Sequence, residues 1–235
     1  MAGLAMNLKV LVTRPEPGAS ATGERIRRLG HHPILSPCLV ITARRVPFPT
    51  RQDAVLITSA QALPALTHLP RQIEIFAVGE ATAAQAREAG FCAVTAAGGT
   101  AADLAVLVVG RLPPGANLLF PTGAGNGLPL ANLLRGAGFC VRRHVAYRAT
   151  PATSLTEAAL AGLDAGVIER VLVFSQATGR HFSALVRQSG RTNALRHSIA
   201  IAISSKAAAS LENLPFASIE TAMAPDQEHM LAMLP

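Results

Sequence analysis

The sequence contains no tryptophan, a single tyrosine and only 15% charged residues, and these shortages exclude several classes of protein. Proteins that bind single-stranded nucleic acid stack bases on aromatic side chains, and they need basic runs that this chain lacks. No apolar stretch reaches the roughly 20 residues that cross a bilayer. The first apolar stretch also lacks the preceding basic residue that is typical of a signal peptide. We therefore expect neither a nucleic-acid partner nor a membrane partner.

Patterns for metals and cofactors are missing as well. The three cysteines, Cys38, Cys92 and Cys140, lack metal or redox spacing, which predicts free thiols in a reducing cytoplasm. The seven histidines form no HExxH pair, and the pair at 31–32 follows a helix-ending glycine, where we expect it to be solvated. The GAGNG stretch at 123–127 fits no dinucleotide fingerprint, and no GxxxxGK[ST] loop exists. We expect no metal and no cofactor.

Positive charge, by contrast, is present in excess. The 235 residues carry a net charge of +7, and almost all of the basic residues are arginine. This balance favours an anionic partner without naming it. Because the arginines are scattered rather than grouped in runs, the sequence favours a small polyanionic ligand held in a cleft. The length suits one large domain or two small ones.

The chain contains two kinds of repeated segment. Residues 9–35 and 117–145 each read as a strand, a turn, an amphipathic helix and a second strand, with Gly30 and Gly138 where a helix end needs a left-handed residue. Residues 53–91 and 169–214 alternate short apolar strands with helices. Such apolar runs are typical of strands buried on both faces of a parallel sheet. We therefore expect an α/β protein with two similar parallel sheets and right-handed crossovers.

Hydroxyl residues and glycines follow the predicted strands, at the edge where open α/β sheets bind ligands. Each hydroxyl has two interpretations: it caps the next helix, contributing about 1 kcal/mol, or it joins free backbone N–H groups in binding an anion. The cap is the simpler interpretation for any one residue, whereas six such turns together favour a ligand site. The candidate ligand contacts are Thr13, Arg14, Thr58, Ser59, Gly79, Thr82, Thr122, Gly123, Ser175 and Ser204.

The segments that join the repeats, 39–46 and 144–152, are extended and carry arginine. Successive strand residues face opposite sides, so only one of Arg44 and Arg45, and one of Arg142 and Arg143, can face a given cleft. Tyr147, the only tyrosine, lies in the second of these segments. It could simply pack a strand, or its phenol could donate a proton or a hydrogen bond.

Taken together, VLVTRP, TSAQAL, AVGEATAAQAREAGF and LANLLRGAGF running into VAYRAT resemble, in this order, the uroporphyrinogen-III synthase family over essentially the whole chain. The resemblance implies two flavodoxin-like domains, one made of 1–38 with 151–235 and the other of 45–144. It implies that 39–44 and 145–150 pair as a two-stranded β hinge. A ligand cleft between the domains and closure on the substrate would follow.

The resemblance also implies an activity. The family's substrate is hydroxymethylbilane, a linear tetrapyrrole with eight carboxylates. The enzyme removes its terminal hydroxyl, inverts the last pyrrole ring through a spiro intermediate and closes the ring to uroporphyrinogen III, without a cofactor. Tyr147 matches the family's tyrosine, which assists departure of the hydroxyl. A monomeric cytoplasmic enzyme, in transient contact with hydroxymethylbilane synthase, is implied.

The last repeat departs from the family's pattern. It has Phe174, Ser175 and Gln176 where many members have a Thr-Ser turn, and Ser204 and Ser205 where many have glycine. A serine can still cap a helix, but it blocks the closest backbone approach that glycine permits. Two other functions therefore stay open: a non-catalytic two-domain protein that binds small anions, and an inactive synthase homologue that serves as a partner.

Overall fold

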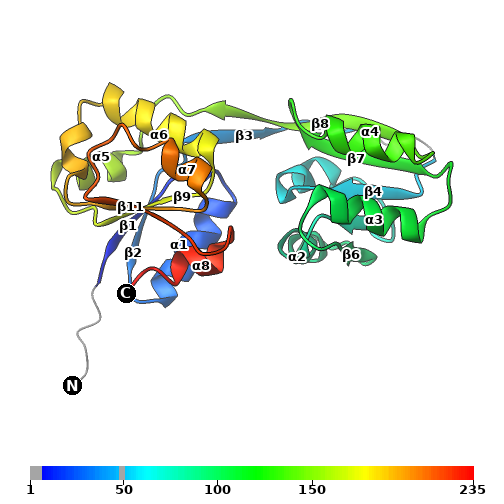
Figure 1. The fold of residues 1–235 in the computed structure, drawn as a ribbon, viewed down its shortest axis with the longest axis horizontal. Coiled ribbons are helices and arrows are strands. Elements are labelled where there is room, and N and C mark those ends of the chain that lie inside the picture. Colours follow the sequence, from blue (N-terminus) through cyan, green and yellow to red (C-terminus); the bar gives the residue numbers. More distant parts are fainter. Residues whose placement is uncertain (1–6, 48–50) are drawn as a thin grey trace, which may run out of the picture. The chain divides into compact units, whose positions relative to one another are not determined.

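The computed structural model describes residues 7–47 and 51–235, which form two compact units, each built on a mostly parallel sheet with helices packed against it (Figure 1). The first unit contains the described residues up to Val40 and those from Thr150 to Pro235. The second unit is the continuous stretch Ile41–Ala149. This architecture confirms the α/β prediction with two parallel sheets. No helix within the described ranges is long and apolar enough to cross a membrane.

The first unit has a five-stranded parallel sheet in the order β11-β10-β9-β1-β2. Strand β1 lies between β2, which follows it in the chain, and β9, which comes from the last third of the sequence. The strands are β1 (Lys9–Val12), β2 (His32–Leu35), β9 (Arg170–Val173), β10 (Ile199–Ala202) and β11 (Ser218–Thr221). The helices are α1 (Gly18–Arg28), α5 (Glu157–Asp164), α6 (Gln176–Gln188), η2 (Thr192–Leu195), α7 (Ser205–Ala209) and α8 (Gln227–Leu231).

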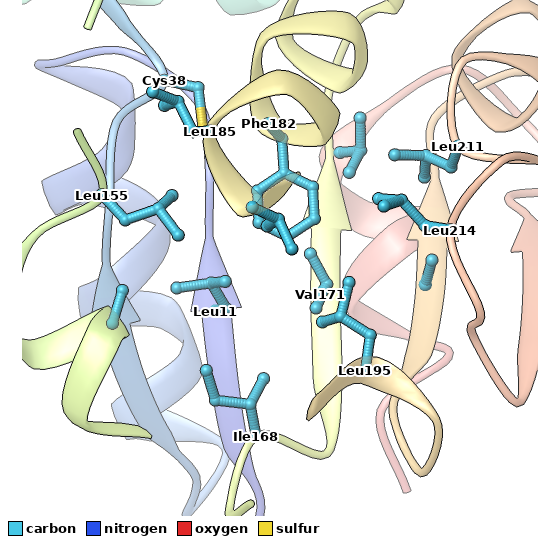
Figure 2. Packing of buried hydrophobic residues seen from close by; sticks show 14 of the residues in the cluster. Leu11, Cys38, Leu155, Ile168, Val171, Phe182, Leu185, Leu195, Leu211 and Leu214 are labelled. Carbon is cyan, nitrogen blue, oxygen red and sulfur yellow. The ribbon is translucent and has the colours of Figure 1, made fainter. Parts of the chain in front are cut away.

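The core of this unit covers both faces of its sheet. Leu11 of β1 packs into one apolar cluster, whereas its neighbours Val10 and Val12 pack into another, because successive strand residues face opposite sides. Phe182 of α6 is fully buried in the first cluster and stacks against Phe216, with the ring centroids 6.4 Å apart. Figure 2 shows Phe182 among the surrounding aliphatic side chains. Burial on both faces explains the continuous apolar runs of these strands.

The second sheet has six strands in the order β3-β8-β7-β4-β5-β6. All four residues of β4 are buried, as its sequence AVLI predicts for a central strand. The strands are β3 (Leu39–Ala43), β4 (Ala54–Ile57), β5 (Glu74–Ala77), β6 (Val94–Ala96), β7 (Asn117–Gly123) and β8 (Cys140–Pro151). The helices are η1 (Ala60–Leu66), α2 (Glu80–Glu88), α3 (Ala101–Arg111) and α4 (Leu128–Gly136).

The chain leaves the first unit within β3 and returns to it within β8, and these two strands are hydrogen-bonded neighbours. The backbone N–H of Arg44 donates to the carbonyl of Ala146 (2.6 Å), and that of Ala152 donates to the carbonyl of Cys38 (3.1 Å). This pattern is antiparallel, since the partner number falls as the chain advances. The movement expected of a hinge formed by these strands stays a prediction.

Two local predictions from sequence have opposite outcomes. Gly30 and Gly138 have φ angles of 84° and 89°, which confirms the left-handed residue predicted after α1 and α4. The prediction for His31 was wrong, because its side chain is only 4% exposed and its Nδ1 accepts a hydrogen bond from the Leu8 backbone at 3.4 Å. The ring thus satisfies a buried N–H at the start of β1, whereas His32 is exposed as expected.

Cys38 is expected to be unreactive in the folded protein. It is fully buried in the cluster around Phe182, and burial raises the pKa of its thiol to about 12, so the nucleophilic thiolate is absent at pH 8. Cys92 and Cys140 are exposed. A thiol-specific chromogenic disulfide at pH 8 should therefore titrate two thiols in the native protein and a third only after denaturant is added. Rapid reaction of all three in the native state would contradict the burial of Cys38.

Candidate functional site

The candidate ligand contacts lie at the carboxyl ends of parallel strands, in one set per unit. In the first unit, Arg14 follows β1, Ser175 follows β9 and Ser204 follows β10. In the second unit, Thr58 and Ser59 follow β4, Gly79 and Thr82 follow β5, and Thr122 and Gly123 end β7. Because neighbouring strands in each set are parallel, the residues of one set share one edge of their sheet, where ligands bind in open α/β folds.

All three serines in these sets cap the helix that follows. The hydroxyl of Ser59 accepts a hydrogen bond from the Gln61 backbone (3.3 Å), that of Ser175 from Thr178 (3.1 Å) and that of Ser204 from Ala207 (3.4 Å). The cap interpretation therefore holds for all three. A hydroxyl that accepts such a bond still has its own O–H to donate, so a cap is compatible with contact to an anion.

The departure at Ser204 does not disturb the backbone. Its φ and ψ of −161° and 162° are extended, a conformation open to any residue, and the serine caps α7. A glycine is therefore not required at this position for conformation. Thr58 and Thr82 are half-buried, so part of each side chain reaches the surface of the second unit.

Thr13 and Thr122 are both buried within their units. Thr13 is fully buried and its hydroxyl donates to the carbonyl of Leu172 at 2.7 Å, which ties β1 to β9. Thr122 is 3% exposed and lies within β7, which continues to Gly123. The sequence places both near strand ends but cannot show that these ends are covered. We therefore assign both hydroxyls to the interior of their units.

Gly79 allows two backbone segments to approach each other. It precedes α2 with an extended φ of −167°, and a β-carbon built on it would lie 3.2 Å from the Cα of Gly99. The Gly99 backbone donates to the carbonyl of Val78 (2.8 Å), and the next residue, Thr100, forms a capping box with Asp103 at the start of α3. This second loop was not predicted from sequence, although its GGT followed by Asp103 is a recognisable helix-start signal.

Arg14 is held in the first unit by uncharged groups. Its Nη1 donates to Gln227 Oε1 (2.9 Å) and to Thr22 Oγ1 (3.3 Å), and its guanidinium lies 4.4 Å from the centre of the Phe174 ring. Gly18 leaves room for it, because a β-carbon there would come within 2.5 Å of its Nε. Phe174, which departs from the family's pattern, thus supplies a cation–π contact. Gln227 is a partner that sequence reasoning missed, since it lies 213 residues away.

The charge of Arg14 has no ion-pair partner among the described residues. Burial lowers the pKa of its guanidinium, while the charge of Glu16 acts in the opposite direction. The side chain stays protonated at neutral pH, because the ordinary pKa of arginine lies far above 7. The Glu16 carboxylate is itself bonded to the backbone and the hydroxyl of Ser20. A partly desolvated cation whose direct contacts are all with uncharged groups is suited to bind an incoming anion.

The arginine pairs near the ends of β3 and β8 differ in their contacts. Arg143 is half-buried and its Nη1 donates to the carbonyl of Asn126 (2.9 Å), in the turn that follows β7. Arg142, Arg44 and Arg45 are exposed. Arg143 thus stabilises a turn of the second unit.

Tyr147 lies on β8 and packs directly on Gly123. Only 9% of its surface is exposed, and it shares an apolar cluster with Val46 and Leu119. A β-carbon built on Gly123 would lie 2.8 Å from the Cζ of the ring and 2.9 Å from the phenol oxygen. The phenol therefore packs beside the strand-end turn that follows β7 in the second unit. Within the described ranges, no cluster of three or more histidine, cysteine or acidic side chains could hold a metal.

The protein has two α/β units, each built on a mostly parallel sheet. Each unit has hydroxyls, glycines or an arginine at its strand ends, which defines a class of two-unit proteins suited to a small anionic ligand. A family comparison then gives the particular family. The family model described as uroporphyrinogen-III synthase HemD matches residues 20–232, so the chain belongs to the uroporphyrinogen-III synthase family. This confirms the resemblance predicted from sequence. Family membership assigns the chain uroporphyrinogen-III synthase activity, that of a cyclising lyase of tetrapyrrole biosynthesis.

Solved structures support the fold. Uroporphyrinogen-III synthetase from Helicobacter pylori is 16% identical, with a TM-score of 0.63, covering 96% of this chain and 97% of that one. A mutant uroporphyrinogen III synthase from the extremely thermophilic bacterium Thermus thermophilus is 20% identical, with a TM-score of 0.50, covering 97% and 96%. At such identities these likenesses speak for the fold alone. A comparison with curated protein sequences gives no significant match.

Proposed function

We propose that the enzyme acts on hydroxymethylbilane and closes it to uroporphyrinogen III, as a monomer in the cytoplasm that receives the bilane through transient contact with hydroxymethylbilane synthase. The C–O bond of the terminal hydroxymethyl group breaks, and a proton from Tyr147 converts the departing hydroxyl to water. The substituted carbon of the last pyrrole ring then attacks the electrophilic carbon that remains, giving a spiro intermediate. The bond between that ring carbon and its original methylene bridge then breaks, and the bridge carbon bonds to the free α-carbon of the same ring. Loss of the proton from this α-carbon completes the inverted, closed macrocycle, and a proton returns to the tyrosinate. The three free thiols suit the reducing cytoplasm.

The protein's main task in this reaction is positioning. The bilane closes unaided to the uninverted isomer, so the enzyme must hold the chain in the conformation from which inversion is faster. Backbone N–H groups and hydroxyls at strand ends are suited to hold the carboxylates. In the first unit these groups are Arg14, Ser175 and Ser204. In the second they are Thr58, Ser59, Gly79, Thr82 and Gly123. The observation that carries this assignment is Arg14, a cation at the strand-end edge whose hydrogen-bond and ring contacts are all with uncharged groups.

An isomer assay tests the proposed reaction. Hydroxymethylbilane is generated enzymatically, the purified protein is added, and the products are oxidised and separated into type I and type III isomers. We expect an excess of type III that grows with protein concentration. Type I alone, as in the sample without protein, would contradict the proposal. It would leave the non-catalytic anion binder or the inactive homologue as the function.

Replacing Arg14 with methionine is expected to raise KM about tenfold while changing kcat less. A hydrogen bond to a charged group contributes roughly 1.5–3 kcal/mol, and about 1.4 kcal/mol corresponds to a factor of ten. Lysine at the same position keeps the charge but not the planar guanidinium, so the KM of Arg14→Lys should lie between those of wild type and Arg14→Met. Steady-state kinetics of type III formation measures the effect.

The matched control is Arg28→Met, at the last residue of α1 and thus at the opposite end of that helix from Arg14. It makes the same change in net charge and should leave KM within about twofold of wild type. Thermal unfolding of both variants separates binding from stability, because Arg14 also packs against Phe174. An unchanged KM in a folded Arg14→Met protein would show that Arg14 has only a structural role.

A further inference from the structure

The pairing of β7 with β8 slips by one residue beside Tyr147. Thr122 pairs with Val145, but the next residue, Gly123, pairs with Tyr147, so Ala146 is an extra residue on β8. Such a β-bulge bends the strand and redirects the side chains that follow it. In a regular strand Ala146 and Tyr147 would face opposite sides. Here both are buried in the same apolar cluster, so the bulge brings the tyrosine onto that face.

Gly123 provides the space that the ring then occupies. A β-carbon at this position would lie 2.8 Å from Cζ, 2.9 Å from Cε2 and 2.9 Å from the phenol oxygen of Tyr147. Real β-carbons do not approach heavy atoms so closely, so any larger residue must displace the ring. Gly123 is not among the glycines with positive φ, so its backbone conformation does not demand glycine. The contact with the ring therefore explains why a glycine is present.

Three hydrogen bonds hold the backbone around this contact. The N–H of Ala124 donates to the carbonyl of Tyr147 (3.1 Å), and that of Asn126 donates to the carbonyl of Gly123 (3.0 Å). Arg143, on β8, donates to the carbonyl of Asn126 (2.9 Å). The turn after β7 is thus tied to β8 at two places, at Arg143 and at Tyr147. These bonds fix the backbones of Gly123 and Tyr147 relative to each other, so a larger side chain at position 123 is accommodated by moving the ring.

We propose that Gly123 and the bulge at Ala146 are positioning elements of the reaction, which fix the place of the Tyr147 phenol by leaving room for its ring. This inference rests on the proposed role of Tyr147 as proton donor. It adds that Gly123 acts through the tyrosine as well as lining the strand-end edge. Displacing the ring moves the donor atom away from the departing hydroxyl, and general acid catalysis requires hydrogen-bond reach.

The test uses a property of the composition. Tyr147 is the only tyrosine and tryptophan is absent, so tyrosine emission and its near-ultraviolet circular dichroism report on this one ring. In Gly123→Ala we expect a changed tyrosine dichroism and stronger acrylamide quenching, together with a fall in kcat of about tenfold or more. The matched control is Gly136→Ala, in α4 of the same unit, where a β-carbon would meet nothing within 4 Å. It should change neither signal nor kcat.

A double variant tests whether Gly123 acts through the phenol. In Gly123→Ala combined with Tyr147→Phe, kcat should be no lower than in Tyr147→Phe alone, because the misplaced group is already absent. If the two substitutions instead lower kcat by the product of their separate effects, Gly123 acts independently of the phenol, and the proposal would be overturned. An unchanged tyrosine signal in Gly123→Ala, or a changed signal with wild-type kcat, would overturn it as well.

A measurement on the wild-type protein covers the case in which Gly123→Ala does not fold. With labelled tyrosine, the ring protons of Tyr147 should show nuclear Overhauser effects to the Hα protons of Gly123. Their absence would overturn the proposal. The readouts on the ring need no substrate, so they stay distinct from the isomer assay. If the protein formed only the type I isomer, the proposed function would be contradicted. The tyrosine signal would still change in Gly123→Ala, so the two failures can be told apart.

Discussion

Tyr147→Phe is expected to lower kcat about 100-fold while the protein stays folded. A positioned general acid contributes roughly 10²–10⁴-fold, and the lower end applies here because the strand-end turns still hold the bilane for ring inversion. Phenylalanine keeps the Cζ and Cε2 atoms that pack on Gly123, so the local packing survives. The rate of type III formation measures the loss, and far-ultraviolet circular dichroism checks the fold.

The isomer ratio gives a second readout of the same variant. Spontaneous closure competes with the slower enzyme, so the share of type I in the products should rise at fixed protein concentration. Thr95→Val is the matched control, since it removes a hydroxyl from β6, at the far edge of the same sheet. It should leave both the rate and the ratio close to wild type. A folded Tyr147→Phe protein with unchanged kcat would remove the tyrosine from the mechanism.

Phe182→Ala is expected to destabilise the first unit by roughly 3–5 kcal/mol, the range found when a buried aromatic ring is deleted from a core. The ring is fully buried and stacks on Phe216, and the leucines and valines around it come from strands and helices that cannot close the gap without moving (Figure 2). This is a large fraction of the stability of a typical domain, about 5–15 kcal/mol. Urea unfolding followed by circular dichroism measures it.

Two comparisons sharpen this prediction. Phe216 is only partly buried, so Phe216→Ala should cost less than Phe182→Ala. The emission of Tyr147 reports on the second unit alone, because the tyrosine lies within Ile41–Ala149. In Phe182→Ala we therefore expect circular dichroism to begin its transition at lower urea than the tyrosine signal. A midpoint equal to that of wild type would show that the cluster around Phe182 is not close-packed.

Strong local signals in the sequence predicted the fold. Runs such as AVLI at β4 are apolar without alternation because both faces of a parallel strand are covered, and the structure buries all four residues. The glycines after α1 and α4 were predictable because a helix end needs a left-handed residue, and both have positive φ. The order of motifs identified the family, and the family match confirms it.

The environment of the candidate site depends on contacts that no local pattern encodes. Thr13 looks like any hydroxyl at a strand end, but β9 covers it and takes its hydrogen bond. The uncharged groups in contact with the Arg14 side chain include Gln227, which lies at the start of α8, near the end of the chain. The bulge at Ala146 depends on the pairing register between β7 and β8. Because a register involves two strands, the local sequence of one strand does not reveal it. Sequence patterns therefore found the strand ends but could not show which side chains remain accessible.

The interleaving of the first unit affects how the chain can fold as it is synthesised. Strand β1 needs β9 as a neighbour, and the paired residues Val10 and Arg170 lie on opposite sides of the whole second unit in the sequence. Domains fold as units during synthesis, and contacts between distant residues form slowly. The continuous second unit can therefore be completed while β1 and β2 are still without β9. On the ribosome, β1 and β2 emerge before the whole second unit but are completed by β9 only after it.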